Sequence, residues 1–249
     1  FISGNVEYNV EGKSYLLKEG DLLLINPLEL HQPRIGPDQN PYERIVLWIN
    51  KTYLSRLCTN NTSLSQCFDN TNPQHTNLLR LTKAQQNYIS SKLSELIEET
   101  RSADYGSDLA AEAILTRFLV ELNRLTLSSE KKVDTEKTTT PLVSEVLSYI
   151  NHHYCEKISL STIADEFFVS KYYLCRAFKR HNGISIHGYL TQKRVMYAKQ
   201  LMEAGETASG AAYRVGFGDY SAFYRAFCQQ YGFPPGELSA RIKPNHRKE

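Results

Sequence analysis

The chain has 249 residues, with 29 Lys and Arg against 27 Asp and Glu, which gives a formal net charge of +2. This length suits one large domain or two ordinary ones, and 41% hydrophobic residues are enough for real cores. No run of about 18 apolar residues occurs, so the sequence predicts neither a membrane-spanning segment nor a membrane partner. Five cysteines without C-x-x-C spacing are typical of reduced thiols in a cytoplasmic protein. The first residues do not have the basic-then-apolar pattern of a secretory leader, so we expect none.

Short β-rich runs fill residues 1–50. The runs are VEYNV, SYLLK, DLLLIN and YERIVLWIN, and they are separated by EGK, KEGD and the proline-rich NPLELHQPRIGPDQNP. This spacing predicts an antiparallel sandwich or barrel.

The segment GDLLLINPLELHQP resembles a turn of the cupin fold, in which a strand ends in a proline and a histidine points into the barrel. The resemblance implies a pocket for a small molecule such as a sugar, bordered by residues 31–34 and the following strand. In that strand Glu43, Ile45 and Leu47 share one face. His31 is either a hydrogen-bonding group in the pocket or a turn residue that caps a strand, and the sequence leaves both open. The predicted ligand-binding residues are His31, Arg34, Glu43 and Ile45.

For these residues the alternative function is that of a metal-dependent cupin enzyme, fused to the domain that residues 141–249 form. Metal-binding cupins use several histidines and a carboxylate. Here His31 is the only histidine before His75, and no H-x-H occurs in residues 1–140. A single imidazole with Glu29 or Glu43 is a poor metal site, so we predict no catalytic residue, no metal ligand and no cofactor. An enzyme of this kind would carry tightly bound iron, manganese or zinc.

Two apolar stripes at helical spacing follow, in residues 83–100 and 108–127. Both stripes are expected to pack on the β domain, and the second is wide enough to serve a partner subunit as well. Residues 128–140 (SSEKKVDTEKTTT) predict a flexible linker. The stripes consist of Ile89, Leu93, Leu96 and Ile97, and of Ile114, Leu115, Phe118, Leu119, Leu122 and Leu125.

The last hundred residues contain one helix-turn-helix pattern twice, at 158–183 (ISLSTIADEFFVSKYYLCRAFKRHNG) and 207–232 (TASGAAYRVGFGDYSAFYRAFCQQYG). Ala164 and Ala212 are 48 residues apart, but Ser170 and Asp219 are 49 apart, so the second copy has one extra residue in its turn. Ser170 and Asp219 are expected N-caps of the second helix of each copy. Two such copies predict a protein that reads two successive DNA grooves.

In each second helix an apolar stripe at i, i+4 faces inward and a polar face remains outside. The stripes are Leu174 with Phe178, and Phe223 with Phe227. Arginine suits bidentate contact with guanine in the major groove, while lysine and tyrosine suit phosphate oxygens. Ordinary solvated helix faces are the alternative, which the duplication disfavours. The predicted DNA-binding residues are Ser170, Lys171, Tyr172, Cys175, Arg176 and Lys179, and Asp219, Tyr220, Ser221, Tyr224 and Arg225.

The stretches IADEFFVSKYYLCRAFKRHNG, GYLTQKRVMYAKQLM and VGFGDYSAFYRAFCQQYGFPP resemble the DNA-binding domain of the AraC/XylS family of bacterial transcription regulators. The resemblance covers about residues 141–243. The resemblance implies an α+β, multidomain fold. The N-terminal domain would be a cupin-like β-barrel with helices. The C-terminal domain would be all-α, with two helix-turn-helix motifs joined by a long helix. The expected domains are 1–127 for effector binding and dimerisation, 128–140 as the linker and 141–249 for DNA binding. The resemblance also implies further strands before Phe1.

The function implied is a sequence-specific DNA-binding transcription regulator, an activator that responds to a small molecule, with double-stranded DNA, RNA polymerase and a second copy of the chain as partners. Charge agrees, because residues 141–249 have a net charge of +5 and residues 1–140 a net charge of −3. The chain departs from the family pattern at Ala208 and Ala211, where isoleucine is usual, and at Ser239, where arginine is usual. Gly210 lowers the stability of its helix by about 1 kcal/mol relative to alanine, so we expect the second helix-turn-helix to be less stable than the first. A DNA-repair protein of the alkyl-transfer type is a rival, but Cys58 and Cys67 lack the count and spacing for its zinc site.

Overall fold

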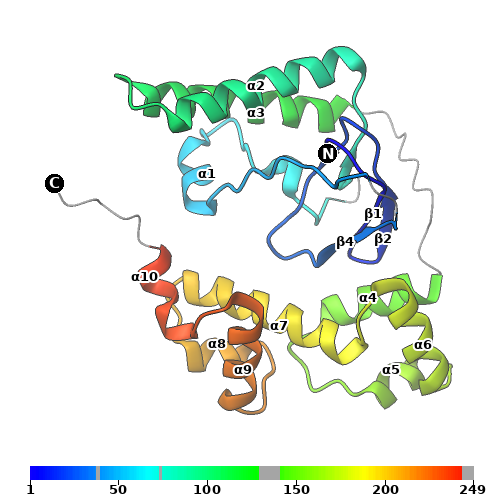
Figure 1. Cartoon of the computed structure of the whole chain (residues 1–249). Coiled ribbons are helices and arrows are strands. Elements are labelled where there is room, and N and C mark those ends of the chain that lie inside the picture. Colours follow the sequence, from blue (N-terminus) through cyan, green and yellow to red (C-terminus); the bar gives the residue numbers. More distant parts are fainter. Residues whose placement is uncertain (38–39, 73–74, 129–140, 243–249) are drawn as a thin grey trace. The chain divides into compact units, whose positions relative to one another are not determined.

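The computed structural model describes residues 1–37, 40–72, 75–128 and 141–242 and divides into two compact units (Figure 1). Unit 1 consists of Phe1–Tyr8, Tyr15–Asn26 and Pro33–Glu136. Unit 2 consists of Asn9–Ser14, Pro27–Gln32 and Lys137–Glu249. Two short segments from the first 32 residues thus belong with the C-terminal helices, which the sequence did not predict. The predicted linker lies, apart from Ser128, outside the described residues.

Five strands form two small sheets in the described residues. The larger sheet has the order β2-β1-β4, and the smaller one pairs β3 with β5 antiparallel, with Leu22 opposite Leu79. A two-residue turn joins β1 to β2, and both its residues have positive φ, 49° at Glu11 and 79° at Gly12. The predicted mixture of β and α domains is confirmed, whereas a closed barrel stays a prediction. The strands are β1 (Val6–Val10), β2 (Lys13–Leu16), β3 (Leu22–Leu23), β4 (His31–Ile35) and β5 (Leu78–Leu79).

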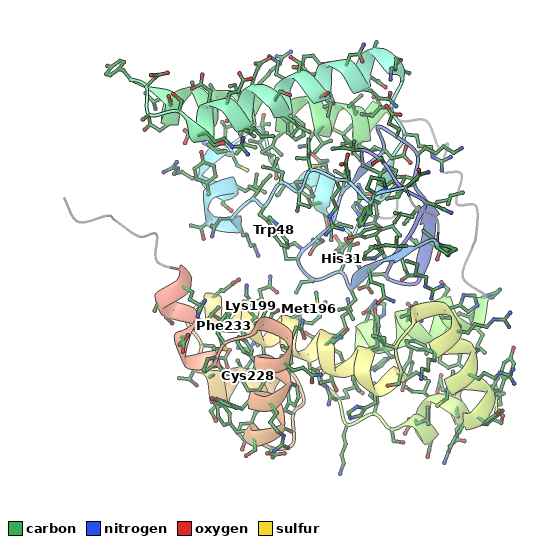
Figure 2. The ribbon with its side chains drawn as sticks, in the orientation of Figure 1. His31, Trp48, Met196, Lys199, Cys228 and Phe233 are labelled. Atoms are coloured by element: carbon green, nitrogen blue, oxygen red, sulfur yellow. The ribbon has the colours of Figure 1, made fainter. Side chains whose placement is uncertain are left out.

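The strand predicted over YERIVLWIN, residues 42–50, is wrong for most of its length. Glu43 forms an isolated antiparallel bridge with Ser3, and residues 44–50 are in no strand. An extended segment becomes a strand only where a neighbour satisfies its backbone groups. Among the described residues this pairing ends at the Ser3 bridge. The apolar side chains of residues 45–48 are exposed, with Trp48 at 85% (Figure 2), whereas Ile49 packs at the edge of the core.

Two long helices provide much of the apolar core of unit 1, as the helical spacing predicts. The residues of their stripes that are buried in one cluster are Ile89, Leu96, Leu115, Phe118, Leu119 and Leu122, while Leu93 and Ile114 pack at its edge. Ile97 and Leu125 are half-buried and lie outside that cluster. The helical elements of unit 1 are α1 (Lys51–Leu57), the 3-10 helix η1 (Gln66–Phe68), α2 (Lys83–Arg101) and α3 (Ser107–Ser128).

Asn123 is a buried polar residue that ties α3 to the η1 segment. Its amide nitrogen donates to the carbonyl oxygens of Leu64 at 3.0 Å and Leu119 at 2.8 Å, and its oxygen accepts from the Cys67 backbone N–H at 2.8 Å. Every polar atom of the side chain therefore has a partner, as burial requires.

Burial raises the pKa of the Cys67 thiol to about 12, so the thiol stays protonated at neutral pH. Because thiolates are the reactive form, we expect iodoacetamide at pH 8 to label exposed Cys155 in the native protein and to leave Cys67 intact. Mass spectrometry of the digested protein checks this. Equal labelling of the two cysteines would contradict the packing around η1, and denatured protein provides the control in which both react.

Unit 2 has two apolar cores that share one long helix. Tyr189 and Leu190, early in that helix, belong to the first core, whereas Val195 and Ala198 belong to the second. A single continuous helix therefore links the two halves of the unit. The helices are α4 (Pro141–His153), α5 (Leu160–Glu166), α6 (Lys171–Asn182), α7 (Ile186–Glu203), α8 (Ala208–Arg214), α9 (Tyr220–Tyr231), the 3-10 helix η2 (Pro235–Glu237) and α10 (Leu238–Ile242).

Candidate nucleic-acid interface

The first helix-turn-helix consists of α5 and α6. Ser170 caps α6, because its hydroxyl accepts the Tyr173 backbone N–H at 3.2 Å, and Gly183 ends the helix in the left-handed conformation at φ 74°. Leu174 and Phe178 are fully buried. The predicted N-cap and the predicted apolar stripe are both confirmed.

The second helix-turn-helix consists of α8 and α9 and repeats this geometry. The Asp219 carboxylate accepts the backbone N–H groups of Ser221 at 2.7 Å and Ala222 at 3.1 Å, and Gly232 ends α9 at φ 76°. Phe223 and Phe227 are fully buried. The second copy is therefore a complete unit with the same start, stripe and end as the first.

The extra residue of the second turn is Gly218. Val169 donates its backbone N–H to the Ala164 carbonyl, and Phe217 donates to the Ala212 carbonyl, both at 3.0 Å, so the two turns match up to these positions. The caps Ser170 and Asp219 follow, directly in the first copy and after one more residue in the second. The insertion thus lies in the turn, as the spacing predicts, and the structure places it immediately before the second cap.

Phe168 occupies the left-handed turn position that Gly216 fills in the second copy. Its φ is 52° and its side chain is 96% exposed, so no burial offsets the strain. A non-glycine residue in this conformation costs about 1–2 kcal/mol. We expect Phe168→Gly to raise the free energy of unfolding by about 0.5–1 kcal/mol after the added chain entropy of glycine is counted.

Urea unfolding of the full chain measures this change, with Gly216→Ala as the matched control. A Cβ at position 216 would lie 2.6 Å from the Cys155 carbonyl oxygen, so the control variant is expected to lose stability. A less stable Phe168→Gly protein would show that the exposed ring stabilises the turn after all.

The polar faces predicted from the sequence are exposed on both second helices. Both arginines, Arg176 and Arg225, are exposed, so neither guanidinium is turned into a core. Cys175 is half-buried, and the Asp219 carboxylate is occupied by the cap. The neighbouring Cys228 thiol raises the pKa of Tyr224 above its ordinary value (Figure 2 labels Cys228). The other predicted residues are exposed: Ser170, Lys171, Tyr172, Lys179, Tyr220 and Ser221.

Sequence reasoning missed exposed residues close to this face. Tyr173, in the first turn of α6, and Arg180, near its end, are exposed beside the predicted set. Phe168 is exposed in the turn itself. A helical projection of α6 could have found the first two, whereas the exposure of Phe168 depends on the turn conformation.

The helix α7 connects the two helix-turn-helix motifs and is firmly attached at its middle. It has 18 residues, which corresponds to about 27 Å at the usual rise per residue. Arg194 donates to the carbonyl oxygens of Tyr154 and Glu156, both at 2.7 Å, and the rings of Tyr154 and Tyr197 stack 4.1 Å apart. Burial lowers the pKa of the Arg194 guanidinium from its ordinary value. The predicted long connecting helix is confirmed, and Arg194 is a structural residue that the sequence did not reveal.

The predicted ligand-binding residues do not gather in one described hollow. His31 is exposed at the start of β4, where its Nδ1 lies 2.9 Å from the Glu29 carbonyl oxygen (Figure 2). His31 belongs to unit 2, whereas half-buried Arg34 and exposed Glu43 and Ile45 belong to unit 1. An open hollow in unit 1 is lined by Ile2, Tyr42, Glu43 and Arg44, so it includes one of the four predicted residues.

Within the described residues, no group of three or more histidine, cysteine, aspartate or glutamate residues is placed to hold a metal ion. In the same parts of the chain, no helix combines the length and apolarity needed to cross a lipid bilayer.

Both halves of the chain match models of known domain families. Residues 1–119 match the model of the AraC-like ligand binding domain, and residues 163–241 match a helix-turn-helix domain model.

The sequence identity to individual curated relatives is low. The HTH-type transcriptional activator RhaS of Enterobacter sp. (strain 638) is 27% identical over 179 residues, which cover 72% of this chain and 62% of that protein. RhaS of Escherichia coli (strain SMS-3-5 / SECEC) is 24% identical and covers 59% of this chain and 53% of its own length. The chain thus spans between half and two thirds of these curated relatives.

Among solved structures, the C-terminal domain of AraT, a response regulator from Geobacillus stearothermophilus, is 26% identical with a TM-score of 0.41, and the match covers 45% of this chain and 95% of that one. The two family models account for most of the sequence, one for each predicted half. The chain belongs to the AraC/XylS family, with an AraC-like ligand-binding domain followed by a tandem helix-turn-helix domain.

Proposed function

We propose that the protein is a sequence-specific DNA-binding transcription regulator, an activator that responds to a small molecule such as a sugar and acts in the cytoplasm. The observation that carries this proposal is the pair of capped helices α6 and α9, each with a buried stripe on one side and an exposed arginine on the other. A capped, exposed helix of this kind fits the DNA major groove, and a second one reads the next groove about 34 Å away.

Contacts to bases and to phosphates have separate roles in this proposal. Arg176 and Arg225 are the residues suited to bidentate contact with guanine O6 and N7. Lys171, Lys179 and Tyr172 suit phosphate oxygens, which fix the register without reading sequence. The excess of basic residues in 141–249 is modest, so affinity depends on groove complementarity as well as charge.

Effector binding is assigned to the N-terminal half. Its match to the AraC-like ligand binding domain supports a ligand there, and Glu43 beside Arg44 in the open hollow offers an acceptor and donors for a polar molecule. We retain His31, Arg34 and Ile45 as candidate contacts. Recruitment of RNA polymerase is part of the same proposal, and the relatives named as transcriptional activators support it.

Selection of bound sequences from random duplex DNA, with and without a panel of sugars, tests the proposal. A conserved sequence motif, bound more or less tightly when one sugar is present, is the expected result. A protein that binds no duplex specifically, even at low salt, would overturn the proposed function.

Dimerisation through the second long helix is part of the same proposal. Beyond the residues of α3 that fill the core, Leu125 is half-buried and Leu127 is 63% exposed, which leaves apolar surface for a partner. We expect sedimentation equilibrium at micromolar concentrations to give a dimer, and Leu127→Lys to shift the equilibrium toward monomer. A monomer at every concentration would contradict this part of the proposal.

A further inference from the structure

The turn between β1 and β2 is built into the helical unit through the side chain of Glu11. Glu11 has φ 49°, a conformation that glycine, asparagine and aspartate adopt more readily in such turns. A glutamate in this strained position indicates that its side chain has a role that outweighs the backbone cost.

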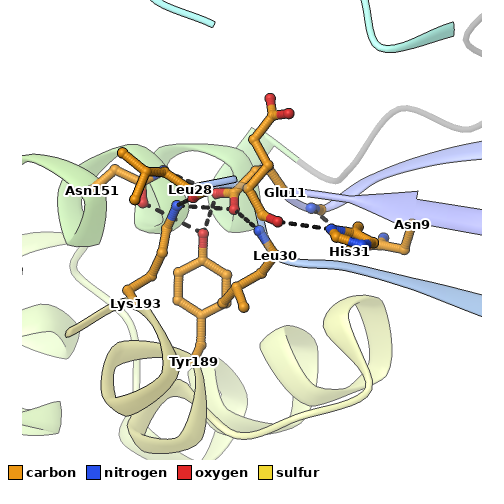
Figure 3. A network of polar contacts seen from close by, with 10 residues as sticks. Asn9, Glu11, Leu28, Leu30, His31, Asn151, Tyr189 and Lys193 are labelled. Atoms are coloured by element: carbon orange, nitrogen blue, oxygen red, sulfur yellow. Dashed lines mark hydrogen bonds and ion pairs between the residues drawn. The ribbon is translucent and has the colours of Figure 1, made fainter. Parts of the chain in front are cut away.

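The Glu11 carboxylate connects α4 to α7 (Figure 3). It accepts Asn151 Nδ2 from α4 at 3.2 Å, and it accepts the Tyr189 hydroxyl and Lys193 Nζ from α7, the latter at 2.9 Å. Burial raises the pKa of Tyr189 well above its ordinary value, so the hydroxyl keeps its proton. One carboxylate therefore joins two helices that share the first core.

Lys193 has no route to solvent in this arrangement. Its side chain is 3% exposed and that of Glu11 is 15% exposed. Besides Glu11, Lys193 Nζ donates to the Leu28 carbonyl oxygen at 2.6 Å, in the second short segment of unit 2. A buried ammonium group without its counter-ion is strongly unfavourable. Without Glu11, Lys193 must either lose its proton or gain contact with water, and a shift of α7 admits that water.

The second of these segments, residues 27–32, also contacts α6 of the first helix-turn-helix. Gln32 Nε2 donates to the carbonyl oxygen of Asn182, the last residue of α6, at 2.7 Å. Leu30 packs against the first core, and Glu11 and Leu30 are joined by a backbone hydrogen bond of 2.9 Å. The turn and residues 27–32 therefore attach together to α4, α6 and α7.

We propose that Glu11 is a positioning residue for DNA binding: with its carboxylate in place, α7 is fixed against α4, and its withdrawal changes how α9 is presented relative to α6. The second helix-turn-helix follows any movement of α7, because Val195 and Ala198 of this helix are part of its core. Because Glu11 lies in the turn between β1 and β2, a movement of those strands would withdraw its carboxylate from α7. This inference rests on the proposed function.

The test uses the full chain and two DNA duplexes. One duplex carries both base sequences selected by the wild type, and the other carries only the base sequence bound by the first helix-turn-helix. We expect Glu11→Gln to weaken binding to the two-element site by about tenfold or more, within the range of coupling between sites, and to leave the one-element site within about twofold. The double variant Glu11→Gln/Lys193→Met removes both charges and is expected to recover most of the loss. Lys13→Gln, exposed in the same hairpin, is the matched control and should bind as the wild type does.

An equal loss of affinity on both duplexes would show that Glu11 only supports the first helix-turn-helix. Unchanged binding would show that Glu11 has no role in DNA binding. Either result overturns the inference. Hydrogen exchange without DNA separates this inference from the proposed function. Amides of α7 should exchange faster in Glu11→Gln than in the wild type, whether or not the protein binds DNA. Unchanged exchange would overturn the inference by itself, while failure of the wild type to bind any duplex would overturn the proposed function.

Discussion

The double variant Arg176→Ala/Arg225→Ala is expected to lose specific DNA binding while remaining folded. Each arginine in bidentate contact with guanine contributes about 1–3 kcal/mol. The two lie on different helices with separate cores, so their losses should add, to about 2–6 kcal/mol. Titration of the selected duplex with each single variant and the double variant measures these losses. We expect the Arg225 loss to be the smaller one, because the first helix of its unit has alanines and a glycine where larger apolar residues are usual.

Lysine variants distinguish base reading from charge. Arg176→Lys and Arg225→Lys keep the positive charge but lose the planar pair of donors, so specific binding should fall while binding to unrelated DNA stays the same. Arg124→Ala in α3, where the guanidinium pairs with Glu121, is the control that removes an arginine outside unit 2. If the alanine variants lose affinity equally on all sequences, both arginines contact phosphate alone.

Truncation of Phe227 to alanine is expected to be the most destabilising single change in the second helix-turn-helix. The ring is fully buried and contacts the rings of Phe223, Tyr231 and Phe233, with centroid distances of 5.6, 4.8 and 5.7 Å. Loss of a buried phenylalanine costs about 3–5 kcal/mol. Because the first and second cores are separate clusters, α8 and α9 should unfold locally while α5 and α6 persist.

Hydrogen exchange resolves the two halves of unit 2 in the Phe227→Ala protein. Fast exchange over residues 207–232, with protection retained over 158–183, is the expected pattern. The matched variant Phe178→Ala should show the reverse. Global unfolding of both halves in either variant would show that α7 makes them one cooperative unit.

Local rules explain why the sequence predicted the second half well. A cap residue, an i, i+4 apolar stripe and a closing glycine are all local, and the 48- and 49-residue spacings located the insertion in the turn between Ala212 and Asp219. The stripes of α2 and α3 were predictable for the same reason. Their burial followed from periodicity alone.

The parts that the sequence did not reveal depend on contacts between distant segments. Residues 42–50 have strong strand character but form no strand beyond the Glu43 bridge, because pairing needs a neighbour that composition cannot specify. Glu11 appears in sequence as an ordinary turn residue, and only the fold brings it to Lys193, 182 residues away. The ligand-binding prediction for His31 and Glu43 was based on a short resemblance and stays a prediction.

Hydroxyl-radical footprinting of the full chain on its selected duplex is the most direct test of the tandem reading of DNA. Two protected patches on one face of the duplex, about 34 Å apart, are the expected result, with the patch assigned to α9 weakened by Arg225→Ala and the patch assigned to α6 weakened by Arg176→Ala. A single protected patch that both substitutions weaken equally would contradict the account.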